Sequence, residues 1–135
     1  MIVCDCPPNL TIPTQNALAV CTHYVVPVSP DFLSAIGVGL LLSRVKRFCE
    51  DMQVSPKLAG VVLSRIGRPA MHRQLTANAL REQFKANVFV AEIHERVQVS
   101  EAVEKNLSIF DYALGSPAAD EFAAMSSELL KRLND

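Results

Sequence analysis

The chain has 135 residues and a mass of 14.8 kDa, the size of one domain. Apolar residues make up 50% and charged residues 20%, which is typical of a globular protein and excludes a disordered or fibrous one. The formal net charge of -1 and the pI near 6.3 argue against a strongly basic nucleic-acid-binding module. We therefore treat residues 1–135 as a single domain.

Two kinds of targeting segment are not expected. The longest apolar run, Ala35 to Leu42, is much shorter than the ~20 residues of a membrane-spanning helix and is interrupted by glycines. No basic region precedes an apolar stretch at the amino terminus, so we expect no export signal. The sequence predicts a cytoplasmic protein without a membrane partner.

The cysteines, at positions 4, 6, 21 and 49, all lie in the first half of the chain. Cys4 and Cys6 are two residues apart and would share one face of a strand, as in half of a metal site. A second pair of cysteines or histidines at the spacing of a zinc finger does not accompany them. Reduced structural thiols are therefore the favoured interpretation.

Four short apolar runs rich in valine and isoleucine alternate with longer amphipathic stretches. This pattern is typical of a parallel sheet built from strand–helix units, with strands buried on both faces. We predict an α/β fold in three layers, a mostly parallel sheet flanked by helices. The predicted strands are Met1–Cys6, His23–Val28, Leu58–Ile66 and Val88–Ile93.

Helical spacing of apolar residues predicts two long helices, from Pro30 to about Asp51 and from Ala70 to Lys85. A third begins at Ser116, a serine N-cap followed by proline in the first turn. Shorter helices are predicted over Thr11–Val20 and from Ser100 onward. The predicted core positions of the long helices are Phe32, Ile36, Leu40, Val45 and Phe48; then Met71, Leu75, Ala79 and Phe84; and finally Phe122, Met125, Leu129 and Leu133.

The stretch Asp5-Cys6-Pro7-Pro8-Asn9 ends the first predicted strand. An acidic residue there lies where α/β sheets place their ligands, and burying it is costly unless it meets a cation, a metal-bound water or several donors. This stretch alone supports a structural interpretation equally well as a functional one. In the structural interpretation, Asp5 caps the next turn and the prolines stiffen the exit from the strand.

Further segments extend this motif in a fixed order along the chain. They are Ile2–Leu10, Thr14–Leu18, Tyr24–Val28, Asp31–Gly37, Gly60–Arg65, Val88–Ile93, Val99–Ala102 and Ser116–Leu130. In this order the chain resembles the carboxyl-terminal half of the ParA/MinD family of deviant Walker ATPases. The resemblance covers nearly all of the chain and is strongest to the ParA branch, which segregates plasmids and chromosomes.

The resemblance implies part of a P-loop NTPase fold of the SIMIBI type, with ATP and Mg²⁺ as cofactors. Asp5 would be the switch II aspartate, which acts on Mg²⁺ through a bound water and near the attacking water. The turn of Pro7, Pro8 and Asn9 would sense the γ-phosphate.

The resemblance also places four residues near the nucleotide base. These are Ser64, Arg65, Ile93 and His94. His94 stands where the family usually has proline, which puts a base contact by that loop in doubt. An exposed loop histidine is more often simply solvated than a general base.

A phosphate-binding loop needs glycines, and a lysine that reaches the phosphates. None of the lysines follows a glycine, and Gly37-x-Gly39 lies in a helix-like stretch. We expect the family's glycine-rich loop upstream of Met1, and neither independent ATP hydrolysis nor tight ATP binding by this chain alone. The strand before that loop would lie between Met1–Cys6 and His23–Val28, so these two must pair directly, leave a gap or recruit a strand from another chain.

The resemblance implies partners as well: a ParB-like centromere-binding protein, a second copy or a full-length homologue, and non-specific DNA on the nucleoid. A basic cluster could contact DNA phosphates, although an ordinary solvated helix face is the alternative. Its residues are Arg68, Arg73, Arg81 and Lys85.

Two other functions remain open on the sequence. One is a non-catalytic interaction module that binds a full-length ParA-like protein or another partner. The other is an unrelated enzyme using Asp5, His23 and Cys4. The spacing of these residues does not match a known pairing of nucleophile and base, so it does not support this function.

Overall fold

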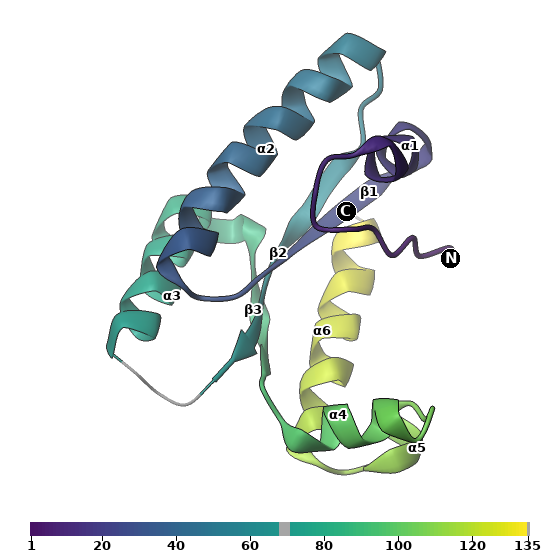
Figure 1. Ribbon diagram of the computed structural model, residues 1–135, viewed down its shortest axis with the longest axis vertical. Coiled ribbons are helices and arrows are strands. Elements are labelled where there is room, and N and C mark those ends of the chain that lie inside the picture. Colours follow the sequence, from purple (N-terminus) through teal and green to yellow (C-terminus); the bar gives the residue numbers. More distant parts are fainter. Residues whose placement is uncertain (68–70, 135) are drawn as a thin grey trace.

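The computed structural model describes residues 1–67 and 71–134, and the side chains at positions 32, 35, 72 and 73 lie outside this description. These residues form a three-stranded sheet with helices on both faces (Figure 1). The elements in chain order are α1 (Ile12–Val20), β1 (His23–Val28), α2 (Phe32–Met52), β2 (Lys57–Ile66), α3 (Met71–Phe84), a 3-10 turn (Lys85–Asn87), β3 (Val88–His94), α4 (Val97–Glu104), α5 (Ile109–Tyr112) and α6 (Pro117–Asn134).

The strands lie in the order β1-β2-β3, and β2 pairs in parallel with both neighbours. Three of the four predicted strands are thereby confirmed within two residues of their predicted bounds, and so is the α/β class. The central strand is the most deeply buried, with Val61 and Leu63 at 0% exposure. Strands that are covered on both faces need this unbroken apolar sequence.

The layers follow from the alternation of side chains along the strands. Val61 and Leu63 of β2 face α2 and α3, where they pack with Val38 and Leu80. Val62 faces the opposite side and packs with Phe89. The residues of α6 that cover this second face are Phe122, Met125 and Leu129, as predicted. The three-layer arrangement is confirmed.

The buried faces of α2 and α3 differ in part from the predicted ones. Ile36 and Leu40 of α2, and Met71, Leu75 and Ala79 of α3, are exposed. Of the predicted positions, Val45 of α2 is buried and Phe84 of α3 packs on the core. The other core residues are Val38, Leu41 and Leu42 of α2 and Ala77 and Leu80 of α3. Both helices carry apolar residues on more than one side, so their spacing could not decide which stripe faces the sheet.

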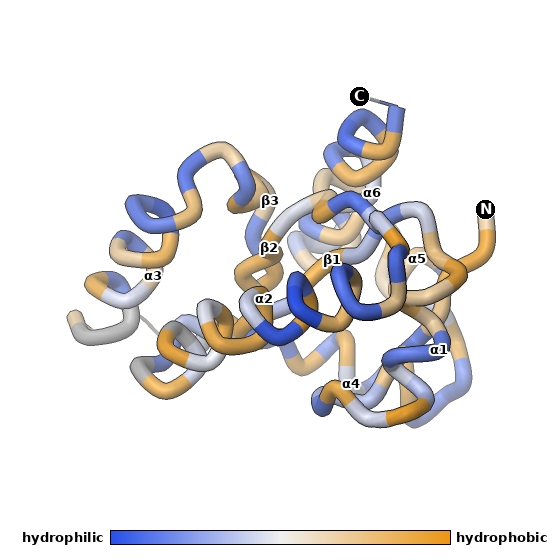
Figure 2. The backbone as a smooth tube through the Cα atoms, turned by 90° about the horizontal axis from the view of Figure 1, so that it is seen from above, coloured by the Kyte–Doolittle hydropathy of each residue, from blue (hydrophilic) through white to orange (hydrophobic). Residues whose placement is uncertain are grey.

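The predicted first strand is wrong for this chain. Residues 1–6 form no strand and are all exposed, and Ile2 is 92% and Val3 78% exposed. In Figure 2 this hydrophobic amino-terminal end lies at the periphery of the molecule. A strand persists only when a neighbour accepts and donates its backbone hydrogen bonds, and no described strand adjoins this segment.

The helices near the carboxyl end begin close to their predicted positions. α6 starts at Pro117, and Ser116 caps it by accepting a hydrogen bond from the Ala119 N–H at 3.2 Å. α4 begins at Val97 and not at Ser100 as predicted. None of the described helices is long and apolar enough to cross a membrane.

Candidate functional site

The carboxyl ends of the parallel strands meet at one edge of the sheet, where α/β proteins bind ligands. Beyond β1, Asp31 caps α2: its Oδ1 accepts from the Ser34 N–H at 2.8 Å and its Oδ2 from the Ser34 hydroxyl at 2.7 Å. These hydrogen bonds lower the pKa of Asp31. They occupy both carboxylate oxygens, so this carboxylate serves the helix end.

The residues predicted to lie near the base come from the ends of β2 and β3. Ile66 pairs with His94, which brings the Ser64–Arg65 and Ile93–His94 segments to the same end of the sheet. Ser64 is half-buried, and Arg65 is exposed with φ of 53°, a left-handed conformation that few non-glycine residues adopt. Ile93 packs into the core against α6. A role beside a nucleotide base stays a prediction for all four residues.

His94 meets a carboxylate and a guanidinium at this edge. Its backbone N–H donates to Glu121 Oε2 at 3.0 Å, and Arg96 donates through Nε and Nη2 to Glu121 Oε1. His94 Nδ1 is buried and lies 3.0 Å from the same Oε1 without hydrogen-bond geometry. Burial raises the pKa of Glu121, but hydrogen bonds from Arg96 and His94 outweigh it and the net pKa is lowered.

A second carboxylate of α6 meets the outer edge of β3. Both oxygens of Glu128 accept from the Val90 N–H at 3.0 Å, and Oε2 also accepts from the Ala91 N–H at 2.9 Å. Arg132 donates to Glu128 Oε1 at 2.7 Å. Burial opposes ionisation of Glu128, yet these donors leave its pKa lowered. Glu121 and Glu128 thus take the place of a neighbouring strand along β3.

Asp5 and the turn after it lie on the surface. Asp5, Pro7, Pro8 and Asn9 are exposed. The hydroxyl of Thr14 in α1 donates to the Asn9 carbonyl at 2.8 Å and to the Pro7 carbonyl at 3.3 Å, so it fixes the shape of the turn. The switch role of these residues stays a prediction.

The described residues contain no cluster of acidic side chains for Mg²⁺. Among them, no group of three or more histidine, cysteine or acidic side chains is arranged to hold a metal ion. Asp5 lies in the exposed amino-terminal segment, and Asp31 is occupied by Ser34. We therefore derive no catalytic step through ATP or Mg²⁺ for these residues.

The predicted basic cluster is only partly visible. Arg68 lies outside the described residues, as does the side chain of Arg73. Arg81 is engaged internally, since it donates to Glu92 Oε1 at 2.6 Å and to the Phe89 carbonyl at 3.1 Å. Lys85 is exposed, with φ of 47°. Of the two described side chains, Lys85 is the one presented to solvent.

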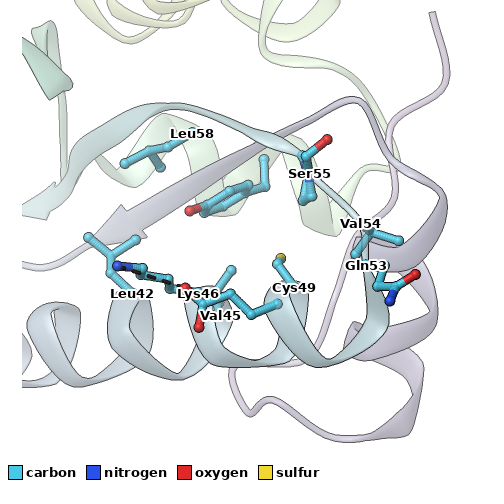
Figure 3. A pocket seen from close by; sticks show the side chains of 11 residues that line it. Leu42, Val45, Lys46, Cys49, Gln53, Val54, Ser55 and Leu58 are labelled. Atoms are coloured by element: carbon cyan, nitrogen blue, oxygen red, sulfur yellow. Dashed lines mark ion pairs between the residues drawn. The ribbon is translucent and has the colours of Figure 1, made fainter.

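A cavity of about 580 Å³ lies at the other end of the sheet, between α2 and the first residues of β1 and β2 (Figure 3). Tyr24, Cys49 and Leu58 are among its lining residues. Burial, with smaller contributions from Cys49 and Cys21, raises the pKa of Tyr24. The cavity opens at the amino ends of the strands, so it is distinct from the edge where α/β sheets place ligands.

Sequence reasoning missed the polar side chains of α6. Glu121, Glu128 and Arg132 join this helix to β3, and none of them was singled out. A signal was present: the spacing of seven residues between Glu121 and Glu128 places both on one side of a helix. Recognising their partners required knowing that β3 is an edge strand.

Comparison with known proteins shows similarity to chromosome-partitioning proteins. A family model described as an AAA domain matches residues 1–59. The chromosome-partitioning ATPase Soj of Thermus thermophilus is 29% identical over the whole of this chain and 54% of its own length. The chromosome partitioning protein ParA of Myxococcus xanthus is 26% identical over 97% of this chain and 46% of its own.

Further similarity extends to the sporulation initiation inhibitor protein Soj of Bacillus subtilis, 25% identical over 95% of this chain and 51% of its own length. The chain therefore spans about half the length of the curated relatives that it matches. Over nearly its whole length, this chain is similar in sequence to about half of the chromosome-partitioning proteins Soj and ParA.

Proposed function

We propose that residues 1–135 act in chromosome or plasmid partitioning as the carboxyl-terminal part of a ParA-like ATPase. The observation that carries the proposal is the match of 95–100% of this chain to proteins named for partitioning or Soj. The α/β fold supports it, since the strand ends gather at one edge as nucleotide sites of this fold class require. The relatives do not favour the alternative of a non-catalytic interaction module.

In this proposal Asp5, with the turn of Pro7, Pro8 and Asn9, belongs to the nucleotide switch of an intact homologue. Ser64, Arg65, Ile93 and His94 would lie near the nucleotide base. The partners are a ParB-like centromere-binding protein and a second ParA-like chain, and the protein is cytoplasmic and associated with the nucleoid.

The partitioning role is tested in the organism that carries the gene. Deleting the coding sequence should raise the fraction of cells that lose the chromosome or plasmid, and the intact gene should restore it. Complementation with Asp5→Ala should fail, whereas Asp51→Ala, an equally exposed aspartate at the end of α2, should succeed. Unchanged segregation after deletion contradicts the proposal.

ATP affinity is a separate question. A triphosphate cradle needs glycines, so that backbone N–H groups converge, and a lysine, and none of the lysines in this sequence follows a glycine. We propose that this chain alone binds ATP and Mg²⁺ only weakly. Titration calorimetry, with full-length Soj as the positive control, should show no binding in the sub-millimolar range; a clear sub-millimolar isotherm contradicts this.

Non-specific DNA is the proposed ligand of the basic cluster. Charge reversal at Arg68, Arg73 and Lys85 should weaken binding to random duplex DNA and reduce its dependence on salt, because fewer counterions are released. Lys57→Glu, at the opposite end of β2, is the control and should leave the salt dependence unchanged. Equal slopes for both variants would remove the DNA proposal.

A further inference from the structure

The cavity between α2 and the amino ends of β1 and β2 has the size of a small-molecule site. Its volume is about 580 Å³, within the range of roughly 300–1,000 Å³ that is common for such sites. All of its lining residues lie between positions 24 and 58, in the continuous unit formed by β1, α2 and β2. The described residues of the amino-terminal segment and of α1 contribute nothing to its walls.

The walls of the cavity are mainly apolar. Figure 3 shows Leu42, Val45 and Cys49 of α2 opposite Leu58 of β2. Val45 is buried, and burial raises the pKa of the Cys49 thiol, so this thiol is uncharged at neutral pH. The ring of Tyr24 is a further part of the lining. An aromatic ligand would therefore meet aliphatic groups, a polarizable sulfur and an aromatic ring, all of which favour it.

Tyr24 brings a hydroxyl without a protein partner to this cavity. The other tyrosine of the chain, Tyr112, donates its hydroxyl to Glu101 Oε2 at 3.0 Å. Within the described part of the chain the Tyr24 hydroxyl has no such partner, although the residue is half-buried. A tyrosine in this setting usually makes a hydrogen bond. Burial raises the pKa of Tyr24, so its hydroxyl keeps its hydrogen at neutral pH and is able to donate it.

The charges at the mouth of the cavity cancel. Among the described lining residues, the charged side chains are Lys46 and Glu50, whose Nζ and Oε1 atoms lie 3.8 Å apart. These side chains are 78% and 64% exposed, so water solvates both. An ion entering the cavity would lose its hydration and meet no unpaired opposite charge, which is costly. The lining therefore favours an uncharged ligand.

We propose that this cavity binds an uncharged aromatic small molecule that accepts a hydrogen bond from the Tyr24 hydroxyl. The ring of the ligand lies between Leu58 and the α2 residues Val45 and Cys49. The site is at the amino ends of the strands, so it is separate from any nucleotide site at their carboxyl ends. This inference does not depend on the proposed partitioning role.

Quinoline is a suitable probe, because it is an uncharged two-ring aromatic molecule at neutral pH and has one acceptor nitrogen. N-methylquinolinium is the matched control ligand, since it keeps the rings but carries a charge and has no acceptor. Each is titrated into the isotope-labelled full chain, and backbone amide shifts are followed by nuclear magnetic resonance. Quinoline should give saturable shifts at residues 24 and 42–58, with a dissociation constant of about 1 mM or tighter. N-methylquinolinium should not saturate in this range.

The role of the hydroxyl is tested by Tyr24→Phe, which keeps the ring. Quinoline should bind this variant about three- to tenfold more weakly, because one hydrogen bond is lost. Tyr112→Phe removes the hydroxyl that is bonded to Glu101 and should bind quinoline like the wild type. Circular dichroism verifies that both variants remain folded. Shifts that do not saturate or that lie elsewhere overturn the proposal, as do equal affinities of the two variants or equally tight binding of N-methylquinolinium.

Discussion

The guanidinium of Arg132 lies over the ring of Phe89, with its central carbon 4.4 Å from the ring centroid. The same guanidinium donates to the carbonyls of Ala59 and Ala86 at 3.2 and 3.0 Å and to that of Val88 at 3.1 Å. One side chain of α6 thus joins the central strand, the 3-10 turn and β3. Because Phe89 is fully buried, this stack connects the surface of α6 to the core.

Replacing Arg132 by alanine should lower the free energy of unfolding by about 2 kcal/mol. The change removes hydrogen bonds from the partly buried carbonyls of Ala59 and Val88 and from the exposed carbonyl of Ala86, and it removes the cation from the ring. Urea unfolding measures the change. Lys131→Ala, at the exposed neighbouring position, should have little effect. A loss below about 0.5 kcal/mol for Arg132→Ala would contradict this interpretation of the contacts.

Glu128→Ala should expose the edge of β3. The Val90 and Ala91 N–H groups lose their acceptors, so we expect a loss of about 1–2 kcal/mol of stability and faster aggregation on warming. Light scattering during a thermal ramp follows the aggregation. Glu82→Ala removes an exposed carboxylate from α3 and serves as the control. Equal aggregation of the two variants would show that Glu128 does not protect the edge.

Stability should fall in acid below about pH 4.5. The pKa values of Glu121 and Glu128 are lowered from 4.5 by folding, so the unfolded chain takes up protons before the folded chain does. The stabilisation is complete above pH 4.5 and is lost as pH falls through the lower, folded values. Urea midpoints measured between neutral and acid pH should drop in this range. In the double variant Glu121→Gln and Glu128→Gln the drop should be smaller.

Gly60 should tolerate no side chain. Its φ is 150°, and a Cβ there would lie 2.6 Å from the Phe89 ring and 2.7 Å from the Asn87 carbonyl oxygen. Gly60→Ala should therefore cost about 2 kcal/mol or more, because the buried ring must shift. Gly37→Ala is the matched control: nothing lies within 4 Å of its Cβ position, and alanine in α2 should stabilise by about 0.5–1 kcal/mol. Thermal melts compare the two variants.

Strand prediction succeeded where each strand finds a partner inside the chain. His23–Val28 is a run whose residues pack on both faces of the sheet, so its composition alone identified it. Residues 1–6 have a similar composition but no described strand beside them to pair with. Strand propensity describes fitness for a paired surface, and only the assembled sheet supplies that surface.

The carboxyl-terminal helix α6 has features that the sequence predicted and features that it did not. Its start at Pro117 and its apolar face followed from local rules, namely the serine cap and the helical spacing of Phe122 and Met125. The role of its polar face did not follow from local rules. Glu128 accepts hydrogen bonds from β3, a strand that is far away in the sequence.

The amino-acid order by itself determined the α/β class, three parallel strands, the principal helices and the resemblance to ParA-like proteins, because period and composition are local properties. The tertiary structure decided which stripes of α2 and α3 are buried, that Arg81 is paired with Glu92, and that Glu121 and Glu128 close one edge of the described sheet while β1 is left open. Those features depend on which groups from distant parts of the chain come into contact and on which groups are shielded from water. No single stretch of the sequence specifies either.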